Sequence, residues 1–165
     1  MYDMILVRYG EMTLKKKNYK TFLNKINDNI KNKCAKYKEL KFFNTDYRFY
    51  IYLNGVDYNL VLEELNTVVG LYSYSLCKKV KYNNRDNVII DIAETAIEVI
   101  NENKPNKEFT FKVETQRGDK TFPLNSIQIS QQVAKLVLPK VEGMRVNVHN
   151  PDLTLHIDLR NEGIY

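Results

Sequence analysis

Several residue patterns that mark metal-binding, redox and membrane proteins are missing from this chain. Its only two cysteines, Cys34 and Cys77, belong to no C-x-x-C pair, so neither metal binding nor redox chemistry is indicated. His149 and His156 have no third ligand near them, and we predict no metal site. No apolar run approaches the roughly 18 residues of a membrane helix, and the N-terminus lacks the pattern of a signal peptide. We therefore expect a cytoplasmic protein with no membrane partner.

What the chain does have is length, apolar content and an uneven charge. Its 165 residues suffice for one medium or two small domains, and 44% of them are hydrophobic, as in a fully folded protein. The net charge is +5, with 15 basic and 8 acidic residues in 1–81 (+7) against 10 and 12 in 82–165 (−2). A basic first half favours a polyanionic partner. A lysine-rich helix surface exposed to solvent would give the same excess.

The first half has the pattern of a ferredoxin-like domain of order βαββαβ. Asp57 is a candidate N-cap, and Gly70 suits the left-handed end of the helix that follows it. Four apolar or alternating segments predict strands, and two amphipathic segments predict helices. The expected elements are strand 4–9, helix 18–37, a hairpin of strands 40–45 and 48–53, helix 57–70 and strand 71–80.

A polar stretch beginning at Tyr82 is the predicted domain boundary, which gives domains 1–81 and 82–165. The second domain is predicted to be an α/β unit of order αβαββ, so the whole chain belongs to the α+β class. Asp86 would open its first helix and Pro105 would end it. Its last two strands, 145–149 and 153–159, would be joined by Asn150-Pro151-Asp152, which is typical of a tight hairpin turn.

Residues 109–124 have the pattern of a strand that leads through a cationic loop to a helix. Phe109 and Phe111 fall on the buried face of the alternating strand. The loop carries Arg117, Gly118 and Lys120 before the N-cap residues of the next helix. Positive charge and free backbone N–H groups would meet there, which suits a phosphate. The alternative is an ordinary solvated turn.

Four segments, taken in order, resemble a known family, the tRNA 4-thiouridine synthetases (tRNA sulfurtransferases) of bacteria and archaea. The opening Arg8-Tyr9-Gly10-Glu11 with Leu14-Lys15-Lys16-Lys17-Asn18 is similar to their "RYGE…LKGKN" pattern. Residues 69–75, 111–124 and 148–163 are similar to "FGI.SFS", "KVE-KR-DK-FP" and "VHNPD…R-EG-Y". The resemblance covers essentially the whole chain. Departures are Lys16, where the family usually has glycine, and Tyr19, where a cation is common.

The resemblance implies an N-terminal ferredoxin-like domain followed by a THUMP domain, which together hold the acceptor stem and 3′ CCA end of a tRNA. In the family, a separate catalytic domain uses ATP and a cysteine to form 4-thiouridine. No Ser-Gly-Gly-x-Asp-Ser loop occurs in these 165 residues, so we expect no cofactor in this chain, with ATP implied only for the catalytic domain. The chain alone is therefore expected not to be catalytic. A homodimer, a separate catalytic domain and a sulfur donor protein are further implied partners.

Combined with the resemblance, the residues give a list of candidate RNA contacts. We expect phosphate contacts from Lys15, Lys17, Lys112, Arg117, Lys120 and Arg160, and hydrogen bonds from Asn18 and Asn150. Phe122 would offer a stacking surface, or else fill the core beneath its loop. The cations of both domains are expected to face one trough.

Two other functions stay open. The first is an adaptor, either a standalone RNA-binding protein or one that dimerises to serve a separate tRNA-modifying enzyme, with the acidic helix 86–102 as its contact surface. The second is a self-contained modification enzyme, which would need a nucleophile. Cys34 falls on the buried stripe of a helix and Cys77 on a strand, and no histidine or aspartate pattern beside either indicates activation.

Overall fold

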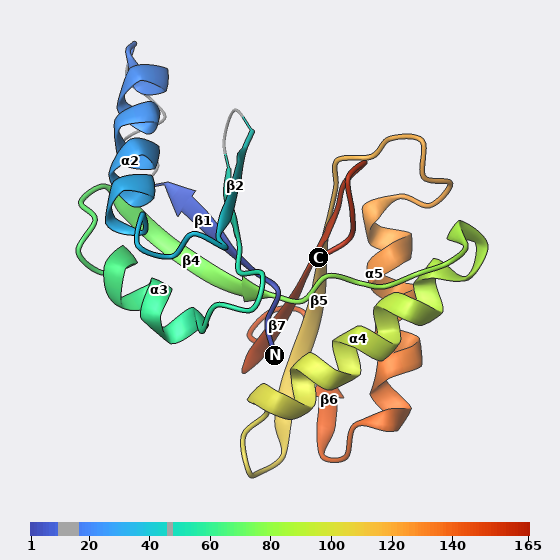
Figure 1. The fold of residues 1–165 in the computed structure, drawn as a ribbon. Coiled ribbons are helices and arrows are strands. Elements are labelled where there is room, and N and C mark those ends of the chain that lie inside the picture. The colour runs from blue at the N-terminus through green and yellow to red at the C-terminus, as the bar shows by residue number, and fades with distance from the viewer. Residues whose placement is uncertain (10–16, 46–47) are drawn as a thin grey trace. The chain divides into compact units, whose positions relative to one another are not determined.

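The chain folds into two compact units, and each is described here by itself. The computed structural model describes residues 1–9, 17–45 and 48–165, and they divide into Met1–Lys78 (unit 1) and Lys79–Tyr165 (unit 2) (Figure 1). The division falls slightly before the predicted boundary. Val80 belongs to the core of unit 2, and its N–H donates to the carbonyl oxygen of Ile164 at 2.8 Å.

Unit 1 is ferredoxin-like, as predicted. Its elements are β1 (Met4–Tyr9), α2 (Tyr19–Lys33), β2 (Lys41–Asn44), β3 (Phe49–Tyr52), α3 (Tyr58–Leu65) and β4 (Leu71–Cys77). The antiparallel sheet has the order β2-β3-β1-β4. Both helices pack on one face of it (Figure 1), where Ile26 of α2 and Val61 of α3 join Ile5 and Ile51 of the strands in one core.

Local signals account for most of unit 1. The predicted hairpin is β2–β3, and the Asp57 carboxylate caps α3 by accepting from the N–H of Asn59 at 2.9 Å. Gly70 has φ +99°, a left-handed conformation, but it lies just before β4 and not at the end of α3. A side chain there would also bring Cβ within 2.7 Å of Cδ1 of Ile26. Gly70 therefore lets β4 start close against α2.

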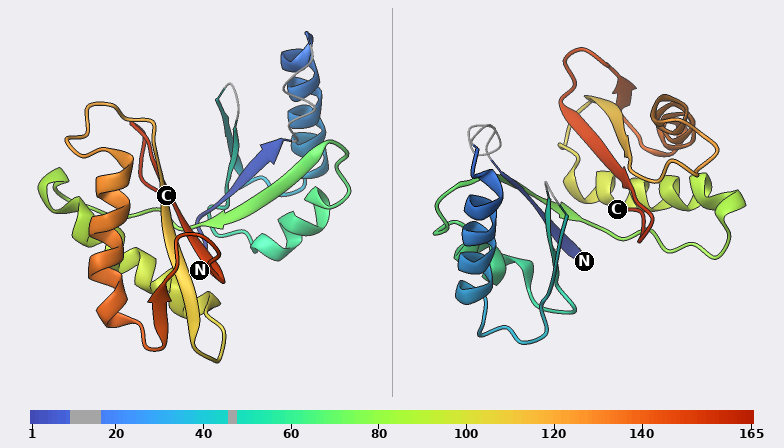
Figure 2. Two further views of the ribbon diagram at one scale, coloured as in Figure 1. Left: turned by 180° about the vertical axis from the view of Figure 1, so that it is seen from behind. Right: turned by 90° about the horizontal axis from the view of Figure 1, so that it is seen from above.

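Unit 2 is a three-stranded parallel sheet with two helices on one face (Figure 2). Its elements are η1 (Arg85–Asn87), α4 (Val88–Asn103), β5 (Phe109–Arg117), α5 (Ser126–Val137), η2 (Leu138–Lys140), β6 (Met144–Val146) and β7 (Leu153–Leu159). Helix α5 starts with a complete capping box, in which Asn125 and Gln128 each accept from the other's backbone N–H at 2.9 Å. Its buried stripe packs with Phe109 and Phe111 of β5.

The predicted hairpin between the last two strands is wrong. The sheet order is β6-β5-β7, and both outer strands run parallel to β5. Asn150-Pro151-Asp152 therefore belongs to a connection that crosses from one side of β5 to the other. An alternating strand pattern gives the buried face of each strand but does not say which strand it pairs with.

Within the described ranges, no helix is long and apolar enough to cross a membrane.

Candidate nucleic-acid interface

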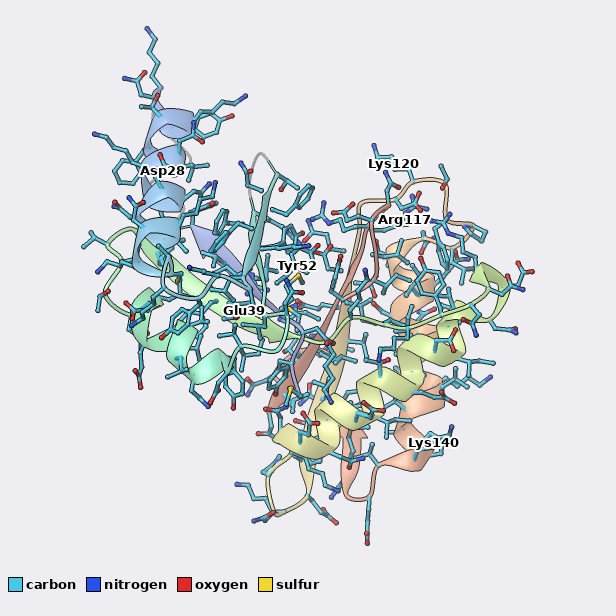
Figure 3. The ribbon with its side chains drawn as sticks, viewed as in Figure 1. Asp28, Glu39, Tyr52, Arg117, Lys120 and Lys140 are labelled. Carbon is cyan, nitrogen blue, oxygen red and sulfur yellow. The ribbon has the colours of Figure 1, made fainter. Side chains whose placement is uncertain are left out.

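The predicted cations of unit 2 meet where β5 and β7 end. Parallel strands carry their carboxyl ends to the same edge of a sheet, and Arg117 pairs in register with Leu159. Arg117, Lys120 of the following loop and Arg160 after β7 are thereby brought to one edge. Arg85 joins them through an ion pair described below. These four residues (Arg85, Arg117, Lys120, Arg160) are called the cationic corner; Figure 3 labels Arg117 and Lys120.

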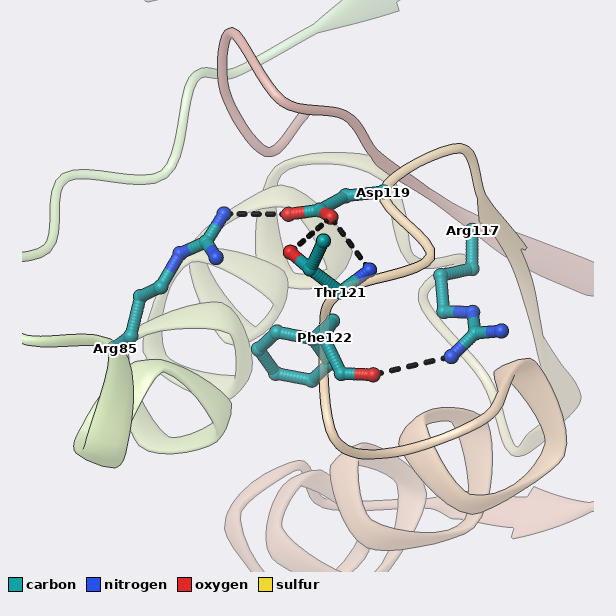
Figure 4. Close-up of polar contacts among 5 residues, drawn as sticks. All are labelled: Arg85, Arg117, Asp119, Thr121 and Phe122. Atoms are coloured by element: carbon teal, nitrogen blue, oxygen red, sulfur yellow. Dashed lines mark hydrogen bonds and ion pairs between the residues drawn. The ribbon is translucent and has the colours of Figure 1, made fainter.

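Arg117 holds the 118–124 loop closed. Its Nη1 donates to the carbonyl oxygens of Phe122 and Leu124, each at 3.1 Å, and the first of these bonds is drawn in Figure 4. Among the described residues, Nε and Nη2 of Arg117 have no recorded acceptor. One side of the guanidinium thus shapes the loop, and the other is left for an outside acceptor.

Asp119 organises the same loop from within. Its side chain is 1% exposed, and Oδ1 accepts from the N–H of Thr121 at 2.9 Å and from its hydroxyl at 2.5 Å. Oδ2 pairs with Nη2 of Arg85 at 2.5 Å (Figure 4). The bonds from Thr121, together with the pair with Arg85, hold the pKa of Asp119 below its ordinary value against the opposing effect of burial.

Sequence reasoning missed the pair of Arg85 and Asp119. The Asp-x-Thr spacing of Asp119 and Thr121 is a local signal for an aspartate-capped turn. No local signal points to Arg85, which comes from a stretch interpreted only as a boundary, 34 residues earlier.

Arg160 packs closely against Gly118 of the loop. Its Nε donates to Oδ1 of Asp158 at 2.7 Å, and its side chain is only 20% exposed. A Cβ on Gly118 would stand 2.8 Å from Cδ of Arg160. Gly118 is therefore needed for the close approach of this arginine, and its φ is not in the left-handed region.

The expected free backbone N–H groups of this loop are largely used within the protein. The N–H groups of Gly118 and Asp119 donate to the carbonyl oxygen of Leu159 at 2.7 and 3.3 Å. Those of Thr121 and Phe122 donate to Asp119. Any phosphate at the corner would therefore be held by side chains.

Lys120 is the most available cation of the corner. It is exposed, and no described residue pairs with its ammonium. Asp119 pairs with Arg85 and Asp158 with Arg160, so these four cations and two carboxylates together carry a net charge of +2 (four minus two). Such a surface attracts a polyanion.

Phe122 lies in the core. Its side chain is 5% exposed and packs in the cluster that includes Ile129 and Val133 of α5. With the ring buried, no face is open for a base to stack on. The structure thus favours the alternative in which Phe122 fills the core beneath its loop. We therefore remove Phe122 from the candidate RNA contacts.

Lys112 and Asn150 do not join the corner. Lys112 forms an ion pair with Glu114, two residues along the same face of β5, and this bond lowers the pKa of Glu114. Asn150 precedes β7, two residues before Asp152, which accepts from the N–H and hydroxyl of Thr110 at 2.9 and 3.0 Å. The two ends of β7, Leu153 and Leu159, are six residue steps apart, or about 20 Å at roughly 3.3 Å per residue.

The remaining predicted contacts belong to unit 1. Lys17 and Asn18 are exposed just before α2 begins at Tyr19. Lys15 lies outside the described residues. The trough shared by both units stays a prediction.

Comparison with known proteins agrees with this architecture. Residues 4–75 match the family model of the ThiI ferredoxin-like domain, and residues 86–165 match that of the THUMP domain. The chain belongs to the tRNA sulfurtransferase family. It corresponds to the ferredoxin-like and THUMP region of that family.

Relatives described as "Probable tRNA sulfurtransferase" match nearly the whole chain. The protein from Acholeplasma laidlawii is 41% identical over 170 residues, covering 100% of this chain and 38% of its own length. That from Geobacillus kaustophilus is 38% identical over 164 residues, covering 99% and 39%. The chain thus spans about 39% of the relatives it matches. A 4-thiouridine synthetase crystallised with RNA and ATP shares the fold, with a TM-score of 0.73 and 24% identity over 99% of this chain and 40% of that one.

Proposed function

We propose that this chain is a tRNA-binding module, which holds the acceptor stem and the unpaired 3′ CCA end of a tRNA. The observation that carries the proposal is the cationic corner. Its two carboxylates are buried, Asp119 in the 118–124 loop and Asp158 in β7, while Lys120 is exposed and Arg117 is half-buried. Internal carboxylates that order a loop, with cations left outside, give a surface suited to phosphates.

Family membership supports the choice of tRNA as the polyanion. The relatives are described as tRNA sulfurtransferases, and one protein of the same fold was crystallised with RNA. ATP use and sulfur transfer belong, in this proposal, to the portion of the relatives that this chain does not span. A homodimer is a further expectation, which sedimentation with and without tRNA would test.

The proposal predicts a salt-dependent interaction with an acceptor-stem minihelix that ends in CCA. Contact with about four phosphates would make log K fall against log salt with a slope of roughly −3 to −4. Fluorescence anisotropy with the full chain at salt concentrations on the order of 50 to 300 mM would measure this slope. Over that range the Debye length falls from about 14 to about 6 Å. No binding at the lowest salt, or a slope near zero, would contradict the proposal.

Lys120→Ala is the sharpest variant for the corner, since Lys120 is exposed and has no partner among the described residues. We expect affinity to fall by about three- to tenfold and the slope to flatten by about 1, the loss of one phosphate contact. Lys140→Ala is the matched control. Lys140 is also exposed, in η2 near the opposite end of β5 (Figure 3). Equal losses in both variants would mean that the corner is not the binding site.

A further inference from the structure

Unit 1 contains a small polar pocket that the cationic corner does not explain. It lies between the first half of α2 and the ends of β1 and β2. Its lining residues are Tyr9, Lys20, Leu23, Asn24, Asn27, Asn44 and Thr45. Its cavity volume is about 90 Å³, well below the roughly 300–1,000 Å³ of pockets for drug-sized ligands, so it suits a group no larger than a single flat ring. Three amide side chains, two hydroxyls and a single cation give it a mostly neutral lining.

Asn27 is the residue that gives this pocket a specific chemistry. A buried asparagine on the core side of a helix is costly unless its amide is hydrogen-bonded. Asn27 is 5% exposed, and its Oδ1 accepts from the hydroxyl of Tyr9 at 2.5 Å. Burial raises the pKa of Tyr9 to about 12, so this hydroxyl stays a donor at neutral pH. In the structure, Oδ1 is the end of the Asn27 amide that faces Tyr9.

The other end of the Asn27 amide is left for the pocket. With Oδ1 committed to Tyr9, Nδ2 presents two N–H donors, and no acceptor for them is recorded among the described residues. Because no buried side-chain nitrogen or oxygen of the described residues lacks a partner, Nδ2 is open to the pocket and can donate to an acceptor that enters it.

We propose that this pocket receives one unpaired nucleobase of the bound RNA, with Asn27 Nδ2 donating to a ring nitrogen or carbonyl oxygen of the base. Base edges alternate donors and acceptors, which the amides of Asn24 and Asn44 and the hydroxyl of Thr45 can match. Lys20 adds the charge for a neighbouring phosphate. A site for phosphate alone would be expected to hold more than one cation. The inference rests on the proposed RNA-binding function.

Asn27→Asp tests the role of the donor with little change in shape. The carboxylate keeps an oxygen for the Tyr9 hydroxyl and replaces the NH₂ group by an acceptor. Asn29→Asp, at an exposed position of the same helix outside the pocket lining, controls for the added negative charge. If the buried carboxylate prevents folding, Asn24→Ala against Asn29→Ala gives the same comparison, because both residues are exposed.

The probe is the CCA-ending minihelix and a series in which one unpaired nucleotide at a time is abasic. We expect one abasic position to cost the unmodified chain roughly five- to tenfold in affinity, the loss of one or two hydrogen bonds. The Asn27→Asp variant should bind intact RNA more weakly by a similar factor, and the abasic nucleotide at that position should cause it no further loss of affinity. In ¹⁵N-resolved NMR spectra, the Asn27 side-chain amide should shift with intact RNA and stay in place with that abasic RNA.

Three results would overturn the inference. The first is that the Asn27→Asp and Asn29→Asp variants bind intact RNA with equal affinity. The second is that the loss of affinity from Asn27→Asp and the loss from the abasic site are independent, so that they multiply when combined. The third is that no abasic position lowers the affinity of the unmodified chain. In each case RNA binding by the unmodified chain would leave the proposed function standing. No RNA binding at all would instead remove the proposed function, and this inference with it.

Discussion

Two loops at opposite ends of β5 in unit 2 are held by the same contact but differ in charge. In the 118–124 loop, Asp119 accepts from the N–H and hydroxyl of Thr121. In the loop before β7, Asp152 accepts from the N–H and hydroxyl of Thr110. Both contacts lower the pKa of the aspartate. An aspartate held by a threonine is thus a folding device in both places, and by itself it says nothing about RNA.

The surroundings of the two aspartates distinguish the loops. In the cationic corner, Arg85 pairs with Asp119 and Arg160 with Asp158, while Arg117 and Lys120 add two further positive charges. Around Asp152, Arg145 pairs with Glu108 and Lys107 lies in the field of Asp152, so the charges balance one for one. The comparison shows that the two loops differ in net charge once the ion pairs within each loop are counted, and that this net charge, not the aspartate–threonine contact, indicates where RNA would bind. The predictions below test whether only the cationic corner binds RNA.

The largest effect is expected from Phe122→Ala. The ring is buried in the core of unit 2, and its removal should lower the free energy of unfolding by about 3–5 kcal/mol. Denaturant unfolding measures this loss. Phe122→Leu should cost less than about 1.5 kcal/mol and leave RNA affinity unchanged. If Phe122→Leu instead bound RNA as weakly as Lys120→Ala while remaining stable, the ring would be an RNA contact after all.

A matched pair of charge-neutral variants compares the loops directly. Thr121→Val removes the hydroxyl bond to Asp119, and Thr110→Val removes the corresponding bond to Asp152. Each should lower Tm by on the order of 5 °C, as expected for one lost hydrogen bond. Only Thr121→Val should weaken RNA binding, by about two- to threefold, because Lys120 loses a fixed position. Thermal unfolding and anisotropy check the pair. Equal weakening by both variants would contradict the distinction between the loops.

The parts of unit 2 that were predictable from sequence are those with local causes. The cap of α5 follows from Asn125 and Gln128, three residues apart, and the buried face of β5 follows from alternation. The pair of Lys112 and Glu114 was readable too, since residues two apart share a face of a strand. This pair makes Lys112 less available to RNA than its charge alone suggests.

The parts that were not predictable depend on contacts between distant segments. Arg85 reaches Asp119 only because the tertiary fold brings η1 to the loop after β5. The order β6-β5-β7 likewise depends on which edges of β5 the last strands occupy, and their alternation is compatible with either a hairpin or a crossing connection. Phe122 was ambiguous because an aromatic residue after a cationic loop suits both a core and a stacking site.

The smallest effect is expected when the pH is lowered, and it concerns the stability of the fold. Because the pKa values of Asp119 and Asp152 are lowered in the folded chain, each carboxylate stabilises the fold fully above its ordinary pKa of 3.8. That contribution is lost as the pH falls through the lower, folded value. Stability should therefore be flat from neutral pH down to about pH 5 with respect to these groups, and should decline below about pH 4.

Asp119→Asn and Asp152→Asn should each make this acid decline shallower by a similar amount, because one proton fewer is taken up on unfolding. Urea unfolding at a series of pH values measures the slope, without RNA, whose bases titrate in the same range. Similar changes would support the view that the two aspartates act alike in folding and that only their neighbours differ. A change for Asp119 alone would mean that the loops differ in how they are held, and the contrast in RNA binding could then come from loop order and not from charge.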